Sequence, residues 1–285
     1  MRHPILISLC AAGSVALSGC EQSKSEDVDR AFQGVNVIDE SNLNDVMLNS
    51  SDPAEAVAYF QRSVGEKPER LDLQRGLAKS LVRASRGTEG VAAWKKVVDH
   101  KDATQEDSVD FADALIRNNE WDRAEAVLNA IPPTYETYKR YRLEAMVADS
   151  NKDWKKADSF YEIAVGLTTQ PASVMNNWGY SKLSRGDFAD AERLFSDAIR
   201  QDATLFTAKN NLVLARGAQR NYAIPVMPVS QTERAQLLYT LGLSAIKQGD
   251  VETGKGLLRD AIETHPQHFE AAARSLGAME ANVSN

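Results

Sequence analysis

The fold is decided by residues 186–198, which read Gly-Asp-Phe-Ala-Asp-Ala-Glu-Arg-Leu-Phe-Ser-Asp-Ala. In this stretch a small residue, Ala191, is followed four positions later by the bulky Phe195 and three positions after that by Ala198. Residues at this spacing share one face of an α-helix. On this face the small Ala191 allows a second helix to come close, and the bulky Phe195 fills the space between the two helices. The pattern predicts a helix that packs closely against a partner helix.

The same helix face recurs along the chain. The small residue returns at intervals of 34, 34, 33 and 34 residues, as Ala56, Gly90, Ala124, Ala157 and Ala191. The bulky residue four positions later is Phe60, Trp94, Leu128, Tyr161 or Phe195, and the third position is Ser63, Val97, Ile131, Ala164 or Ala198. A second, upstream register pairs a bulky with a small residue, as in Leu77-Ala78, Phe111-Ala112 and Trp178-Gly179. The chain therefore consists of repeated helix pairs.

A period of 34 residues built from two helices is typical of the tetratricopeptide repeat (TPR). Each unit covers the apolar face of its neighbour, so a run of units buries a continuous core. We expect an all-α TPR solenoid, a right-handed superhelix, over residues 51–282, beginning at an N-cap on Asp52 with Pro53 at the first helical position. The alternative is a helical bundle whose periodicity is accidental.

The repeat breaks once, near residues 221–230. Val213 lies 34 residues after Gly179 and continues the first-helix register, but the second helix of that unit would contain Pro225 and Pro228. The repeat restarts at Ser230 and Glu233, which form a capping-box pattern. The apolar segment between them packs over the end of the preceding helix or serves as a docking strip for a partner.

The N-terminus has the pattern of an exported lipoprotein. An apolar stretch from Ile5 to Leu17 is too short to span a bilayer but suits a signal peptide, and it ends in Leu17-Ser18-Gly19-Cys20, a lipobox. We expect residues 1–19 to be removed, Cys20 to carry the lipid, and residues 20–50 to form a tether. Glu21 favours the outer membrane, facing the periplasm. The alternative is an ordinary signal peptide with an incidental cysteine.

Composition and motifs argue against several classes of function. The 285-residue chain has a net charge of −7 and no long basic run, so nucleic acid is not an expected partner. His265 and His268 flank Pro266, which would break a helix holding both imidazoles on one face. No catalytic or phosphate-binding motif is present, so we expect no enzyme, no metal, no cofactor and no small-molecule substrate.

The first helices of TPR units line a groove, and this register assigns ten residues to it. They are Arg75, Lys79, Arg83, Arg117, Lys139, Arg142, Asn176, Asn177, Tyr180 and Asn210. The cations and amides predict the binding of an acidic or C-terminal peptide. The alternative is that these side chains are simply solvated.

Four phrases of the sequence are more specific than the repeat pattern. They lie at residues 139–146, 176–183, 209–216 and 231–238, and read Lys-Arg-Tyr-Arg-Leu-Glu-Ala-Met, Asn-Asn-Trp-Gly-Tyr-Ser-Lys-Leu, Lys-Asn-Asn-Leu-Val-Leu-Ala-Arg and Gln-Thr-Glu-Arg-Ala-Gln-Leu-Leu. Together with the lipobox, they resemble the TadD lipoproteins of tight-adherence (Flp) pilus systems. The resemblance implies a scaffold in pilus assembly and secretion, a pilotin-like partner of the secretin. It gives only Cys20 a defined role, lipid attachment.

Two other functions stay open from the sequence. One is a TPR lipoprotein subunit of the machinery that inserts outer-membrane proteins. The other is a periplasmic cell-wall hydrolase using scattered carboxylates.

Overall fold

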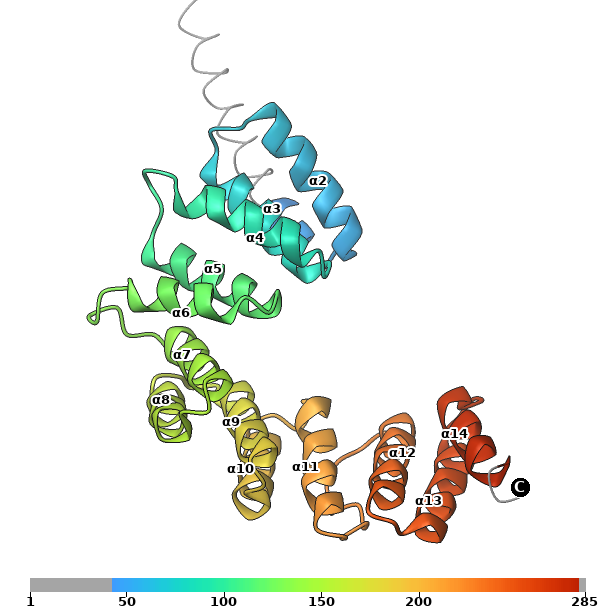
Figure 1. The fold of residues 1–285 in the computed structure, drawn as a ribbon. Helices are drawn as coiled ribbons and strands as arrows, with labels where there is room; N and C mark the ends of the chain where they lie inside the picture. The colour runs from blue at the N-terminus through green and yellow to red at the C-terminus, as the bar shows by residue number, and fades with distance from the viewer. Residues whose placement is uncertain (1–42, 282–285) are drawn as a thin grey trace, which may run out of the picture. The chain divides into compact units, whose positions relative to one another are not determined.

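The computed structural model describes residues 43–281, and within this range the regular structure is α-helical (Figure 1). The predicted signal peptide, Cys20 and most of the predicted tether lie outside these residues. None of the helices between residues 43 and 281 is long and apolar enough to cross a membrane.

The chain divides into two compact units, residues 1–93 and 94–285, with the boundary inside α4 (Gly87–Val98). The described part of the first unit holds a short helix at residues 43–49, then α2 (Pro53–Glu66) and α3 (Leu71–Arg83). The second unit contains ten further helices within the described residues. They are α5 (Gln105–Arg117), α6 (Trp121–Asn129), α7 (Tyr138–Ser150), α8 (Trp154–Gly166), α9 (Ala172–Ser184), α10 (Phe188–Gln201), α11 (Phe206–Ala218), α12 (Gln231–Lys247), α13 (Val251–Thr264) and α14 (Glu270–Ala281).

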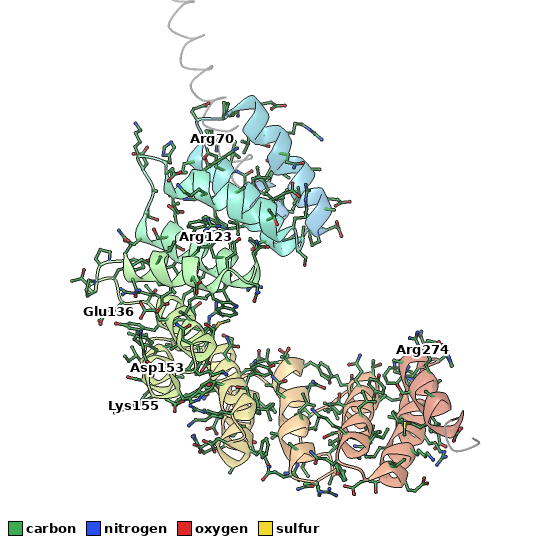
Figure 2. The ribbon with its side chains drawn as sticks, in the orientation of Figure 1. Arg70, Arg123, Glu136, Asp153, Lys155 and Arg274 are labelled. Atoms are coloured by element: carbon green, nitrogen blue, oxygen red, sulfur yellow. The ribbon has the colours of Figure 1, made fainter. Side chains whose placement is uncertain are left out.

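Several helices, among them α2, α8 and α12, begin at a side chain that accepts from their free N–H groups. Asp52 accepts from the backbone of Ala54 at 2.8 Å and caps α2, with Pro53 at the first helical position, as predicted. Ser230 and Glu233 form the predicted capping box of α12. Asp153, labelled in Figure 2, accepts from the Lys156 backbone at 3.2 Å and caps α8.

Paired helices approach closely at the predicted small residues. Ala56, Ala124, Ala157 and Ala191 are fully buried, and the bulky residues four positions later are at most 2% exposed. In α9 a Cβ on Gly179 would lie 2.7 Å from the ring of Phe195 in α10, so only glycine fits this contact. Figure 1 shows α9 and α10 packed side by side. The repeated helix face is therefore the inter-helix contact.

The turn after each first helix has one recurring backbone conformation. Its left-handed residue is Ser85, Asn119, Lys152, Gly186, Arg220 or Gly249, with φ between 59° and 85°. The N–H of the next residue returns to a carbonyl five positions back, for example Asp187 N to Lys182 O at 2.9 Å. This bond closes the helix C-terminus as in a Schellman motif.

After α11 the turn forms but no helix follows. Residues 222–229, which we call the strap, form no regular secondary structure, and Ile224, Met227 and Val229 pack against cores built from α10 to α14. Arg220 donates to Asp250 at 2.8 Å and fastens the start of the strap to the α12–α13 turn. Val226 is fully exposed. The segment packs through its half-buried residues and leaves Ala223, Val226 and Pro228 exposed to solvent.

Candidate functional site

A pocket of about 460 Å³ lies in the second unit, on the face formed by the first helices α7, α9 and α11. Three of its lining residues, Asn176, Asn177 and Tyr180, belong to the groove predicted from the sequence. The remaining lining residues are Trp121, Met146, Asp149, Ser150, Trp154, Tyr161, Ser181, Ser184, Thr207 and Asn211. Three successive first helices thus contribute to one cavity.

Two tryptophans reach the pocket from the recurring turns. Trp121 and Trp154 are the first residues of α6 and α8, each two positions after a left-handed turn residue. The Trp121 indole donates to Asn119 Oδ1 at 2.8 Å. The guanidinium of Arg185 lies 5.6 Å from the centre of the Trp154 ring. These contacts fix the positions of both indoles in the lining of the pocket.

The amides form a ladder between neighbouring first helices. Asn211 in α11 donates to Asn176 Oδ1 in α9 at 3.0 Å, and both side chains are buried. Asn177 contacts the Met146 sulfur at 3.5 Å, a weak hydrogen bond that leaves its amide able to bind a ligand. Tyr180 is 57% exposed. An extended peptide backbone offers the donors and acceptors that such groups require.

Asn210 lies away from this ladder. Its side chain accepts from Thr240 in α12 at 2.8 Å and it does not line the pocket. The neighbouring Asn211, which the sequence did not single out, takes the pocket position instead.

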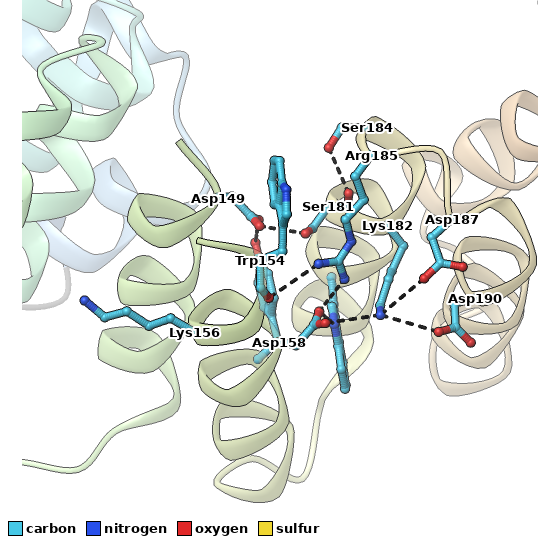
Figure 3. A network of polar contacts seen from close by, with 12 residues as sticks. Asp149, Trp154, Lys156, Asp158, Ser181, Lys182, Ser184, Arg185, Asp187 and Asp190 are labelled. Atoms are coloured by element: carbon cyan, nitrogen blue, oxygen red, sulfur yellow. Dashed lines mark hydrogen bonds and ion pairs between the residues drawn. The ribbon is translucent and has the colours of Figure 1, made fainter. Parts of the chain in front are cut away.

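Asp149 supplies the carboxylate of the pocket. It accepts from the Ser181 hydroxyl at 2.6 Å and from the Tyr161 hydroxyl at 2.9 Å (Figure 3). Burial raises the pKa of Asp149 above its ordinary value, although both hydroxyl bonds and the nearby Arg185 act in the opposite direction. Burial also raises the pKa of Tyr161 well above its usual range. Asp149 therefore links α7, α8 and α9 at some electrostatic cost.

A second carboxylate network lies beside the pocket and ties α8 to α9 and α10 (Figure 3). Asp158 accepts from Arg185 at 2.6 Å, from the Trp178 indole at 2.7 Å and from Lys182 at 3.2 Å. Burial alone would raise the pKa of Asp158, but these hydrogen bonds outweigh it and lower the pKa. Lys182 also lies 3.4 Å from Asp187 and from Asp190. The network holds the helices behind the pocket in place.

The predicted cations of α5 and α7 are compensated by acids on α5. Lys139 pairs with the buried Asp110. Asp113 accepts from Arg117 at 2.8 Å and lies 3.8 Å from Arg142. Two carboxylates therefore offset most of the charge of these three cations, and this face is less positive than the sequence alone predicted.

The remaining predicted cations belong to α3 in the first unit. Arg83 donates to the backbone oxygens of Leu48 and Ser51, which anchors the short helix at residues 43–49 to α3. Arg75 is half-buried and Lys79 is exposed. They share a helix face, as their spacing predicts.

The histidine pair near the C-terminus makes only local contacts. His265 Nδ1 lies 2.8 Å from the Gln267 oxygen, and His268 lies 3.0 Å from Glu270. Across residues 43–281 no cluster of three or more histidine, cysteine or acidic side chains is placed to hold a metal ion.

A profile of the tetratricopeptide repeat matches residues 236–268, the second part of α12 and all of α13. The helix pairs, their spacing and this match agree. The described residues fold as a TPR array of helix pairs. No curated protein sequence matches it.

Solved TPR structures share the fold at low sequence identity. A TPR protein from Parabacteroides merdae is 12% identical, with a TM-score of 0.55 over 91% of this chain and 99% of that one. PilW, a type IV pilus biogenesis factor, is 13% identical, with a TM-score of 0.56 over 82% of this chain and 96% of that one. A chain of the APC/C hetero-tetramer Cut9–Hcn1 is 12% identical, with a TM-score of 0.57 over 83% of this chain. This TPR chain spans 48% of that last protein.

Proposed function

We propose that this TPR protein is a lipid-anchored scaffold on the periplasmic face of the outer membrane that binds a segment of a protein partner during assembly of a Flp/Tad-type pilus. In this proposal its partner is the secretin or another assembly component, and its role towards the secretin is that of a pilotin. The observation that carries the proposal is the pocket on α7, α9 and α11.

The pocket suits a peptide better than a reacting substrate. Its rings and methionine give apolar surface, while Asn176, Asn177 and Asn211 supply amide donors and acceptors. Such a mixture binds side chains in apolar space and orients a backbone by hydrogen bonds. A volume of about 460 Å³ accommodates a few residues of an extended chain.

The lipobox at residues 17–20 supports the membrane part of the proposal. A lipid on Cys20 would confine the pocket to the membrane surface, where the partner is also held. Confinement raises the effective concentration of each for the other, so modest peptide affinity suffices. The TadD-like phrases support the pilus setting, and the likeness to PilW supports the fold that such factors use.

The test compares the amount of assembled secretin multimer in outer membranes from several strains. One strain lacks the protein, and each of three others carries a single variant, Cys20→Ala, Asn177→Leu or Tyr180→Ala. Tyr138→Ala serves as the matched control, because Tyr138 is a 41% exposed tyrosine that does not line the pocket. We expect multimers to be lost without the protein or its lipid, and reduced by the two pocket variants only.

Other outcomes redirect or end the proposal. Normal multimers without pili would move the function to a later step, such as pilin handling. Normal multimers with normal pili in the strain lacking the protein would rule out the pilus role and leave a TPR scaffold of another process.

A further inference from the structure

The pocket on α7, α9 and α11 has one charged lining residue, Asp149. The others are aromatic, amide, hydroxyl or thioether side chains. Within residues 43–281 no basic group lies in ion-pair distance of Asp149, and its two close partners are the neutral hydroxyls of Tyr161 and Ser181. The negative charge of the cavity is therefore not cancelled from within.

The position of Asp149 is unfavourable for the fold. It lies in the last turn of α7, where the helix dipole disfavours negative charge, and this last turn contains no basic residue. It is partly desolvated, which raises its pKa. The guanidinium of Arg185, which lowers the pKa of Asp149 through space, is itself bonded to Asp158 at 2.6 Å. Each of these features would be relieved by a cation arriving from solution.

The rings of the pocket also favour a cation. Trp121, Trp154, Tyr161 and Tyr180 line the same cavity, and aromatic faces attract ammonium and guanidinium groups. Trp154 already engages the guanidinium of Arg185 at 5.6 Å. Trp121 and Tyr180 contact no cation among the described residues, so their faces remain open to a ligand.

We propose that this pocket takes a lysine or arginine side chain of the bound peptide and discriminates against an acidic one, with Asp149 as the residue that sets the preference. The inference rests on the proposed peptide-binding function and specifies its ligand. It reverses the charge preference expected from the sequence, because Asp110 and Asp113 offset most of the charge of the predicted cations on α5 and α7, whereas Asp149 has no ion-pair partner within residues 43–281 and is affected by Arg185 only from beyond ion-pair distance.

The test measures binding of the full chain, purified in detergent, to fluorescent peptide pools. The pools differ only in one central residue, which is Lys, Arg, Leu or Glu, while the flanking positions are mixtures. We expect the Lys and Arg pools to bind about tenfold more tightly than the Glu pool. Fluorescence anisotropy gives the ratio directly.

Asp149→Asn tests the role of the charge, because it removes the negative charge and keeps the shape of the side chain. Ser181 and Tyr161 bond to different oxygens of Asp149, so in the variant the asparagine oxygen accepts from one hydroxyl and its NH2 group donates to the oxygen of the other, which keeps both ties between the helices. We expect the ratio between the Lys and Glu pools to fall close to one. Glu162→Gln is the matched control, since it removes an equal charge from an exposed position on α8 and should leave the ratio unchanged.

The outcomes separate this inference from the function on which it rests. Tyr180→Ala should weaken binding of every pool if the pocket is used at all. Weakening by Tyr180→Ala with equal binding of the Lys and Glu pools would overturn the charge preference and leave the scaffold proposal intact. Discrimination that survives Asp149→Asn, or no binding of any pool, would also overturn the inference.

Discussion

The turn that follows α9 and the turn that follows α11 have the same backbone, yet one leads into a helix and the other into the strap. Gly186 and Arg220 are both left-handed, with φ of 84° and 61°. The bonds from Asp187 to Lys182 and from Asn221 to Arg216 measure 2.9 and 3.0 Å. What differs is the sequence beyond the turn, where Pro225 and Pro228 forbid a helix.

This difference shows that the turn is encoded locally and does not require the helix after it. Where the second helix is missing, the neighbouring first helices close up. A Cβ on Gly217 of α11 would lie 2.8 Å from the Ser244 Cβ of α12, a direct contact between successive first helices. In the regular unit, the corresponding close contact is made within the pair, between Gly179 and Phe195.

The largest effect should come from removing the central ring of the regular unit. Phe195 is fully buried, so Phe195→Ala should lower the free energy of unfolding by about 3–5 kcal/mol. Met227→Ala in the half-buried strap should cost about 1 kcal/mol. Urea denaturation followed by circular dichroism compares the two. Equal losses would mean that the strap is as strongly packed as a helix pair.

The close approach at Gly179 gives the next effect. Gly179→Ala places a methyl group against the Phe195 ring and should cost about 1–3 kcal/mol. Gly256→Ala in α13 is the control, because no atom lies within 4 Å of its added Cβ. That variant should gain about 0.5–1 kcal/mol from helix propensity. A gain in both variants would contradict the packing described for α9 and α10.

Glu233 tests the electrostatics of the irregular unit. It lies 3.0 Å from Lys209, which is 3% exposed, and the Ser230 backbone hydrogen bond and Lys209 lower its pKa. Glu233→Gln keeps the capping box but removes the charge, and should cost about 1–2 kcal/mol at neutral pH.

The sign of the pH dependence follows from the lowered pKa. Stabilisation by Glu233 is present above the ordinary carboxyl pKa and is lost as pH falls through the lowered one. The difference between the wild type and Glu233→Gln should therefore disappear in acid. Thermal unfolding across acidic and neutral pH measures it, and a difference that persists in acid would assign the effect to packing.

The smallest effect should come from the anchor of the strap. Asp250→Asn weakens the bonds from Arg220 and Tyr222 at an exposed site, so the loss should be below about 1 kcal/mol. The same variant should speed protease cleavage within residues 222–229, because the strap detaches more often. Mass spectrometry of limited digests locates the cut. Unchanged cleavage would show that Ile224 and Met227 hold the strap without the ion pair.

The sequence predicted the repeat because its small and bulky positions are periodic. The spacing of residues such as Ala191 and Phe195 is enough to predict the helix face that packs, and the structure confirms the array of helix pairs. The break at Pro225 could also be predicted, since proline is not tolerated in the interior of a helix. The route of the strap could not be predicted, because Ile224 and Met227 pack against cores built from five helices, α10 to α14.

The site was predicted only in part. Asn176, Asn177 and Tyr180 lie on a helix face that the register assigns, whereas Asp149 and the two tryptophans join them through tertiary contacts. The pairing of Lys139 with Asp110 and of Arg142 with Asp113 could have been predicted from the sequence. Asp110 and Asp113 precede them by the same 29 residues, the offset between facing positions on α5 and α7. Acid and base at a constant offset are a signal of pairing between successive helices.

The strap also marks the point in the helix array at which the cooperativity of unfolding changes. In a solenoid each element is held mainly by its nearest neighbours, so unfolding spreads from one helix to the next. The second helix that would follow α11 is missing. The helices on the two sides of the strap therefore interact only through the contact between α11 and α12 and through a few strap side chains. We expect amide protons in α12 to α14 to exchange as one block and those in α7 to α10 as another. Local unfolding that starts in the C-terminal helices would then stop at the strap, before it reaches the helices that form most of the pocket.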